Sequence, residues 1–451
     1  MFTLLLLIGL VAIMLTGYQH TGKYIVSPVV VVSIAFILSV LLGFTQYSQW
    51  DFSLSPKTFL LVFGGISAFA LGCVFIHTIS TSRSNQFDTV KVKAELNYDE
   101  SHKLFSNKFY AGMLIFQGIS GIYVYRHFKE VLGSYGLSSD SFANVLSNSN
   151  YLAKFSGEGY GSLLSGMSSI LYFIIVVFAF VSGYCIVRLI VLKKRPSILL
   201  IINFLFSSVF PLVSGGRLLT IQIFAGFLFL LLFELQKNGI VASFPKIRMK
   251  WVVLAIAALV IFVGLFVFLL PLLGRSTDGK GFYYYLCIYI AAPLKNLDLS
   301  VNNPIKAPTY FGSYSFSTLY EALIKMNIVD SSTMQNLSSI TEFRQINGYE
   351  LGNVSTIFDS LQIDFGLIGS FMYMFFLGLF IQYFFEKAIS ANENRGVSFL
   401  SVFSVMLTST LFLSFFSNMF DPNIFSTGLL KLLLPLAVFV LISKKSNTRR
   451  V

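Results

Sequence analysis

The sequence predicts an all-α polytopic membrane protein, and three observations support this fold class. Hydrophobic residues make up 55% of the 451 residues and charged residues 12%, about half of the roughly 25% that soluble domains carry. The mean hydropathy is +0.76. Apolar runs of the length that crosses about 30 Å of hydrocarbon recur along most of the chain, which indicates repeated membrane crossings.

We predict about 11 transmembrane helices, within a range of 10–12. Residues 1–273 contain the first eight, residues 274–366 form one large loop outside the membrane, and residues 367–451 contain the last three and a basic tail. Within the loop, Phe282–Pro293 is apolar but too short to cross, so we expect an interfacial or re-entrant helix. The predicted spans are Phe2–Thr16, Ile25–Phe44, Thr58–Ile76, Phe109–Tyr125, Leu163–Leu189, Ser197–Val213, Leu218–Leu235, Trp251–Leu273, Leu367–Phe385, Ser398–Phe416 and Thr427–Ile442.

The basic residues set the expected orientation. The net charge is +12, and Lys and Arg gather in short loops such as Arg188–Arg195 and Lys237–Lys250 and in the C-terminal tail. Under the positive-inside rule these segments face the cytoplasm, and the large loop lies on the opposite side. The charge therefore indicates orientation and gives no reason to expect nucleic acid as a partner.

The sequence lacks the patterns of several catalytic classes. Cys73, Cys185 and Cys287 are far apart, and the four histidines show no paired spacing, so we expect neither a metal site nor a disulfide framework. No Walker-type phosphate loop and no GxSxG nucleophile elbow occurs. The spans also carry few charged residues, which disfavours a proton-coupled transporter.

The first candidate site is the turn between the sixth and seventh spans. Gly215 and Gly216 permit a tight reversal, and Arg217 starts a helix at the membrane surface. Its guanidinium can bind phosphate oxygens in a bidentate manner. Arg275, just beyond the eighth span, adds a cation on the same side. The alternative for Arg217 is an arginine that anchors the turn to lipid phosphates.

The second candidate site is the end of the large loop, where polar residues precede the next span. A carboxylate here, Glu350 or Asp359, can act as general base and draw a proton from an attacking hydroxyl group. Asp364 has an alternative role as a cap of the helix that begins at Leu367. The other candidate residues of this segment are Arg344, Asn353 and Thr356.

These motifs resemble those of the Wzy family of O-antigen and oligosaccharide repeat-unit polymerases. The resemblance lies in Gly215-Gly216-Arg217 opening a helix, in a large external loop beginning after Arg275, and in two motifs before the ninth span. These two motifs are Gly352-Asn353-Val354-Ser355-Thr356 and Asp364-Phe365-Gly366. One dominant external loop late in an eleven- or twelve-span protein also matches the family, whereas the Ser355-Thr356 pair departs from it because an aromatic residue is expected beside the threonine.

The resemblance implies an O-antigen polymerase in the bacterial inner membrane, with its C-terminus in the cytoplasm. Such a glycosyltransferase uses no metal or other cofactor and joins undecaprenyl-diphosphate-linked oligosaccharides at the periplasmic face. In this interpretation Arg217, Arg275 and Arg344 bind the diphosphate, and Glu350 or Asp359 is the catalytic base. The supporting residues are Gly215, Gly216, Asn353, Thr356 and Asp364.

The expected partners are the lipid-linked oligosaccharide, membrane lipids and a chain-length regulator protein. Three alternatives stay open. An O-antigen ligase shares the fold class and the use of arginines but transfers the glycan to a lipid A core. A lipid-linked oligosaccharide flippase is a transporter, for which short loops and related halves are expected. A non-enzymatic scaffold leaves the glycine–arginine turn without a role.

Overall fold

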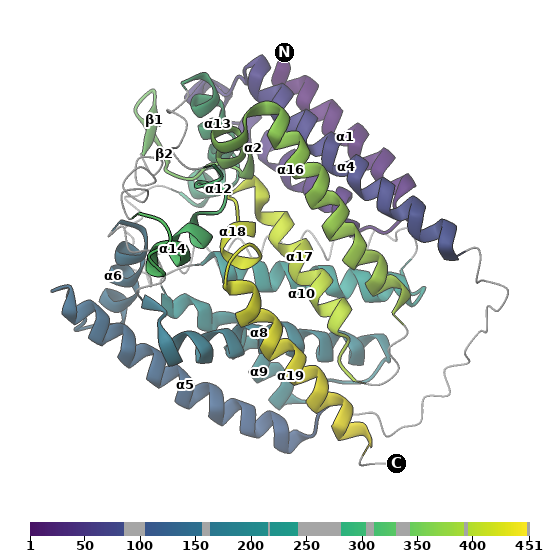
Figure 1. Ribbon diagram of the computed structural model, residues 1–451, viewed down its shortest axis with the longest axis vertical. Helices are drawn as coiled ribbons and strands as arrows, with labels where there is room; N and C mark the ends of the chain where they lie inside the picture. The colour runs from purple at the N-terminus through teal and green to yellow at the C-terminus, as the bar shows by residue number, and fades with distance from the viewer. Residues whose placement is uncertain are drawn as a thin grey trace. The chain divides into compact units, whose positions relative to one another are not determined.

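The computed structural model describes residues 1–84, 104–155, 163–214, 217–241, 281–303, 311–330, 343–391 and 396–448. These residues form helices and one short hairpin (Figure 1). Five helices are long and apolar enough to cross a membrane, and they are Phe2–His20, Pro56–Ser82, Gly166–Val191, Leu218–Lys237 and Ile357–Ser390. The described residues thus have the architecture of an α-helical membrane protein.

The elements follow one another in this order: α1 (Phe2–His20), α2 (Pro28–Phe44), α3 (Tyr47–Trp50), α4 (Pro56–Ser84), α5 (Asn107–Ser134), α6 (Phe142–Phe155), α8 (Gly166–Val191), α9 (Ile198–Val209), η1 (Phe210–Ser214), α10 (Leu218–Lys237), α12 (Phe282–Ile290), α13 (Ala292–Asn302), α14 (Ser317–Lys325), β1 (Arg344–Ile346), β2 (Tyr349–Gly352), α16 (Ile357–Ser390), α17 (Phe399–Phe412), η4 (Leu413–Phe415), α18 (Phe420–Asn423) and α19 (Gly428–Thr448).

The predicted spans that fall on described residues each overlap a helix. Trp251–Leu273 lies outside the described residues. Three apolar helices, Pro28–Phe44, Ile198–Ser214 and Phe399–Phe415, are shorter than the five long ones, so the number of crossings stays a prediction. The clearest difference in bounds is at α16, where a helical part from Ile357 precedes the predicted start at Leu367 and a kink at the non-helical Gly366 separates the two parts.

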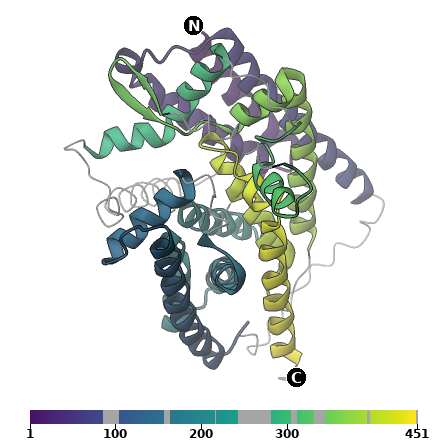
Figure 2. The same cartoon turned by 60° about the vertical axis from the view of Figure 1, so that its left-hand side comes forward.

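Two helices replace the single short one predicted at Phe282–Pro293. Helix α12 ends at Ile290, and α13 begins at Ala292 with Pro293 in its first turn. Proline lacks a backbone N–H, so it suits the start of a helix and disrupts its interior. Most side chains of α13 are buried, and α13 packs against α2 and β2. The hairpin and the α12–α13 pair lie side by side in both views (Figures 1 and 2).

The chain divides into two compact units. The first contains Met1–Val74, Ser243–Gln382 and Thr410–Leu429, and the second contains Phe75–Ala242, Tyr383–Ser409 and Leu430–Val451.

In the first unit, glycines let α4 and α16 approach closely. A β-carbon on Gly72 would lie 2.3 Å from the carbonyl oxygen of Phe375, and one on Gly378 would lie 2.3 Å from that of Phe69. The Cys73 thiol also donates to the Gly378 carbonyl at 3.5 Å. Small residues at such crossings are typical of helices that associate in lipid, where tight packing replaces the hydrophobic effect.

In the second unit, buried amides join α5 to α9. The Gln117 Nε2 donates to Asn203 Oδ1 at 3.1 Å and to Ser207 Oγ at 3.0 Å, and Asn203 Nδ2 donates to the Tyr110 carbonyl at 2.9 Å. Interhelical hydrogen bonds of this kind contribute about 0.6–2 kcal/mol each in a membrane. They explain how α5, a span diluted by polar residues, is held in the helical bundle.

Candidate functional site

The first turn of α16 is built around a carboxylate. Thr356 caps the helix, because its Oγ1 accepts the N–H of Phe358 at 3.3 Å, and Asp359 follows in the first turn. A negative side chain is favoured there because unpaired N–H groups give a helix N-terminus partial positive charge. The sequence Thr-Ile-Phe-Asp therefore fixes both the start of α16 and the place of Asp359.

Asp359 is the most enclosed of the predicted acidic and basic site residues that the structure describes. Its side chain is only 5% exposed, and the groups that act on its carboxylate include the hydroxyl of Ser300 and the guanidinium of Arg344. Ser300 is on α13 and Arg344 on β1. Two residues predicted separately from the sequence, a diphosphate ligand and a base, thus belong to one cluster in the first unit.

Asn296 on α13 holds this cluster together. Its Nδ2 donates to the carbonyl oxygens of Leu351, Gly352 and Val354 at 3.2, 3.5 and 2.8 Å, and its own carbonyl accepts from Arg344. Because Asn296 is 1% exposed, these bonds form away from solvent. They hold in place the segment from Leu351 to Val354, which leads into α16. The sequence analysis missed Asn296; its signal was a polar residue that follows Lys295 at the end of an apolar run.

Glu350, the second candidate base, is in a different setting. It lies on β2 opposite Gln345 of β1, and its side chain is exposed. The hairpin turn uses Asn347 and Gly348, both with positive φ, as tight hairpin turns require. The Tyr284 hydroxyl donates to the Glu350 backbone carbonyl at 3.3 Å, so this contact orients the strand and leaves the carboxylate uninvolved.

Two more predicted residues complete the segment. Asn353 is half-buried between β2 and α16. Asp364 lies within α16, and its carboxylate accepts the backbone N–H groups of Tyr314 and Ser315 at 3.3 and 2.6 Å. It therefore fixes the turn before α14, whereas the alternative drawn from the sequence had it capping the helix from Leu367. The two aspartates of α16 contact different elements.

Arg217 belongs to the second unit. It is 8% exposed and immediately precedes the first turn of α10. The Tyr172 hydroxyl lies 3.5 Å from Ser214 Oγ, which ties α8 to the turn that leads to the arginine. Gly215, Gly216 and Arg275 lie outside the described residues.

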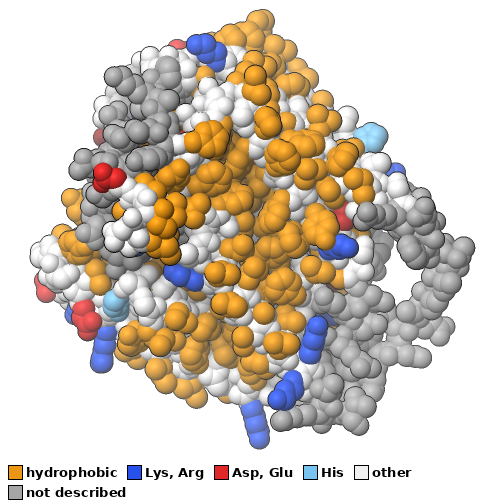
Figure 3. Space-filling model, viewed as in Figure 1, with side chains coloured by type: hydrophobic (Ala, Val, Ile, Leu, Met, Phe, Trp, Pro, Cys, Tyr) orange, Lys and Arg blue, Asp and Glu red, His pale blue; other side chains and the backbone are white. Residues whose placement is uncertain are grey.

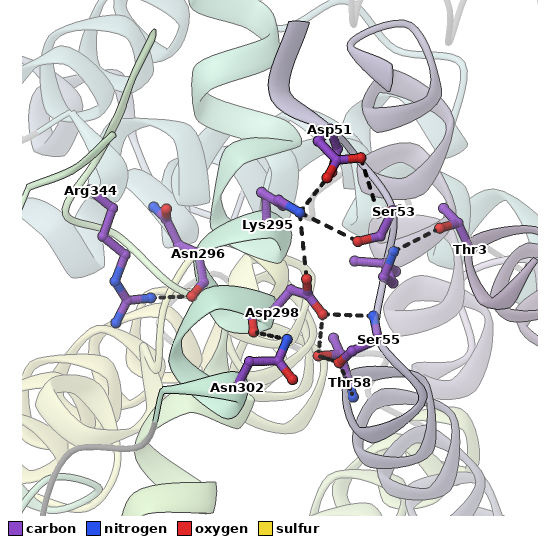
Figure 4. A network of polar contacts seen from close by, with 11 residues as sticks. Thr3, Asp51, Ser53, Ser55, Thr58, Lys295, Asn296, Asp298, Asn302 and Arg344 are labelled. Atoms are coloured by element: carbon purple, nitrogen blue, oxygen red, sulfur yellow. Dashed lines mark hydrogen bonds and ion pairs between the residues drawn. The ribbon is translucent and has the colours of Figure 1, made fainter. Parts of the chain in front are cut away.

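Lys295 and Asp298 form a buried ion pair that the sequence analysis did not predict (Figure 4). The Lys295 Nζ lies 3.5 Å from Asp298 Oδ2 and donates to the carbonyl of Asp51 at 2.7 Å. Asp298 Oδ1 accepts from the Ser55 N–H at 2.8 Å and from Thr58 Oγ1 at 2.7 Å. This pair joins α13 to the start of α4, next to Asn296.

The start of α14 is bound by a carboxylate of another helix. Asp421 on α18 accepts from Ser317 Oγ at 2.6 Å and from the Thr318 N–H and Oγ1 at 3.1 and 3.0 Å. It thereby binds the first turn of α14, where N–H groups lack helical partners. Burial raises the pKa of Asp421 to about 6, and the hydrogen bonds oppose this rise only in part.

We expect Asp421 to make stability depend on pH. Its folded-state pKa of about 6 exceeds the ordinary 3.8, so its contribution is fully present below about pH 4 and is lost as the pH rises through 6. A difference of about two pKa units corresponds to about 3 kcal/mol. The thermal unfolding temperature in detergent, read with a thiol-reactive dye that reports exposure of the buried cysteines, should fall between pH 5 and 7 in the unsubstituted protein.

Asp421→Asn should flatten this pH profile. The pKa of Glu321 is raised by burial and also by the charge of Asp421, so Glu321→Gln is introduced into both proteins and their difference then isolates Asp421. Parallel profiles for the two proteins would contradict the assignment.

The fold and the site together define a helical membrane protein with an arginine–carboxylate cluster at the start of a long apolar helix. Among the described residues, no group of three or more His, Cys, Asp or Glu side chains is arranged to hold a metal ion. In comparisons with protein-family models, curated proteins and solved structures, nothing matches this chain.

Proposed function

We propose that this protein is a Wzy-type O-antigen polymerase, which transfers a glycan from undecaprenyl diphosphate to a second lipid-linked repeat unit. The observation that carries the proposal is the Asp359 carboxylate, which is buried with the Arg344 guanidinium acting on it. A carboxylate can act as general base toward a sugar hydroxyl, and cations stabilise a departing diphosphate. The resemblance of the surrounding motifs to the Wzy family supplies the substrate class.

In the proposed reaction, Asp359 takes the proton of the acceptor hydroxyl group. The acceptor oxygen forms a bond to the anomeric carbon of the donor glycan as the bond from that carbon to the diphosphate oxygen breaks. Undecaprenyl diphosphate leaves with the electron pair, and Arg344 takes up its charge; Arg217 and Arg275 stay diphosphate ligands proposed from the sequence. Asp359 is preferred over Glu350 as base because a cation acts on it and its position is fixed by the start of α16.

Arginine suits the diphosphate better than lysine does. A guanidinium keeps its charge when buried and offers five N–H donors in a planar fork that matches two phosphate oxygens. In the contacts described, the Asn296 carbonyl accepts one bond from Arg344. Arg344 is therefore oriented by the protein before a substrate binds, which lowers the cost of binding.

Helix-end contacts support the proposed inner-membrane topology, in which α1, α4 and α16 all start on the periplasmic side. In the first unit, the Leu54 N–H donates to Thr3 Oγ1 at 3.0 Å, which joins the starts of α1 and α4. In the second unit, Lys237 Nζ donates to the carbonyls of Ala388 and Ala391 at 2.7 and 2.9 Å. Lys237 is the last residue of α10, and Ala388 and Ala391 lie at the end of α16. The charge pattern assigns both of these helix ends to the cytoplasm.

The test is a lipopolysaccharide gel from a source-strain deletion, complemented with the intact gene. Loss of the long ladder with core plus a single repeat unit remaining, and its return on complementation, is the result expected of a polymerase. Unsubstituted core alone would favour a ligase or a flippase. An unchanged ladder would contradict the O-antigen proposal.

Arg217→Ala should prevent restoration of the ladder at normal expression. Loss of one charged hydrogen bond costs about 2 kcal/mol, which slows the reaction roughly 30-fold if it acts in the transition state. Arg217→Lys is the matched control, because a lysine also anchors a turn to lipid phosphates but cannot bind bidentately. We expect neither variant to restore the full ladder, and full activity of the lysine variant would leave Arg217 with an anchoring role only.

A further inference from the structure

The start of the segment from Phe311 to Asp330 has its polar and apolar sides reversed relative to a water-facing helix. The polar residues there face the protein: Ser313 and Ser315 are buried, and Ser317 and Thr318 bind Asp421. Three large apolar side chains of the segment face outward, with Phe311 78%, Met326 65% and Ile328 66% exposed, while the polar residues exposed near its end are Lys325, Asn327 and Asp330. In water this arrangement would expose apolar area without compensation.

The carboxylates that hold the segment prevent it from turning its apolar side inward. Asp364 binds the N–H groups before α14, and Asp421 binds the first turn. Asn418 adds a bond from its Nδ2 to the Ser315 carbonyl at 3.2 Å. The orientation of α14 is thus set by hydrogen bonds made on its polar side.

The exposed apolar surface continues onto α16. The ring of Phe311 lies 4.9 Å from that of Phe365, and Phe316 lies 6.2 Å from Tyr373, measured between ring centroids. On the same helix, Ile368 and Met372 are exposed. Hydrophobic side chains cover both α14 and α16 in the space-filling view (Figure 3).

Helix α16 is long and apolar enough to cross a membrane, and 22% of its most apolar window is buried in the protein. Most of that window is therefore available to hydrocarbon, and Ile368 and Met372 are four positions apart, so they lie on one face of the helix. Phe311 packs against Phe365, and Phe316 packs against Tyr373. Phe365 precedes Ile368 in the sequence of α16, and Tyr373 follows Met372.

We propose that α14 and the turns on either side of it are embedded in the outer part of the bilayer, with Phe311, Met326 and Ile328 in contact with lipid acyl chains. The occupant is bilayer lipid because the surface is continuous with the exposed apolar stripe of a membrane-crossing helix, and because the polar residues at the start of the segment are already bound by the protein. This part of the large loop therefore lies at membrane depth and is not surrounded by water.

Spin labels test the depth directly. Phe311→Cys, Met326→Cys and Ile328→Cys are each labelled in the full chain, reconstituted in vesicles of phosphatidylethanolamine and phosphatidylglycerol. Met372→Cys on α16 serves as lipid reference and Gln345→Cys on the exposed hairpin as water reference. Cys73, Cys185 and Cys287 are buried, and labelling of the unsubstituted protein measures their background.

Collision rates with oxygen, which partitions into lipid, and with a water-soluble nickel chelate give the outcome. We expect a ratio of oxygen to nickel collisions that is severalfold higher than at position 345 and close to that at position 372. Nickel collisions as frequent as at position 345 would overturn the proposal, because the segment would then lie in water. Low rates for both reagents would also overturn it, since protein would cover the surface, and dipolar broadening that disappears on dilution with unlabelled chains would identify a second copy.

Discussion

Asp359→Asn is expected to abolish the long polysaccharide ladder while the protein still folds. An asparagine has nearly the same shape and can bond to the Ser300 hydroxyl that acts on Asp359, but it cannot take a proton. Loss of a general base typically slows a reaction about 100- to 10,000-fold. The measurement is the ladder in the complemented deletion strain, together with the rate of transfer between lipid-linked repeat units by purified protein.

Glu350→Gln separates the two candidate bases. Its side chain is exposed on β2, so its loss should leave the ladder intact if Asp359 is the base. The opposite pattern, with an active Asp359→Asn and an inactive Glu350→Gln, would identify Glu350 on the hairpin as the base. Thermal unfolding of both variants excludes misfolding as the cause of any loss.

Asp298→Ala is expected to cause the largest loss of stability. It would leave the Lys295 ammonium buried without its carboxylate, and the Ser55 N–H and Thr58 hydroxyl without their acceptor. Breaking one partner of a buried ion pair costs about 3–5 kcal/mol. The unfolding temperature in detergent should fall by on the order of 10 °C.

The double variant Lys295→Met with Asp298→Ala provides the control. Removing both charges avoids an uncompensated ion, so the double variant should recover part of the loss, as a double-mutant cycle with favourable coupling. An additive cycle would show that the pair contributes no coupling energy. Asp51→Asn is a second control, since Lys295 binds the backbone carbonyl of Asp51 and not its side chain.

The positions of the helices follow from the sequence because membrane helices are specified by local composition. Apolar runs predicted α1, α4 and α10, whose backbone groups pair within each helix. The part of α16 after the kink at Gly366 begins at Leu367 as predicted, whereas the part before it was not predicted because Ile357–Asp364 is too polar to resemble a span. Thr356 caps the first turn of α16, and hydrogen bonds bind the polar residues of this part of the helix. A hydropathy profile registers neither effect.

The sequence by itself determined the helical membrane class and singled out Arg344 and Asp359 as polar groups near one span. Only the tertiary structure decided that the Arg344 guanidinium acts on the Asp359 carboxylate, since Asn296 of α13 binds both Arg344 and the segment that leads into α16. The same holds for the bonds of Lys295 and Asp298 to Asp51, Ser55 and Thr58, and for Asp421 at the first turn of α14. Each is a buried polar contact between separate elements, and the free-energy cost of burying its groups is offset only when their partners lie within hydrogen-bonding distance.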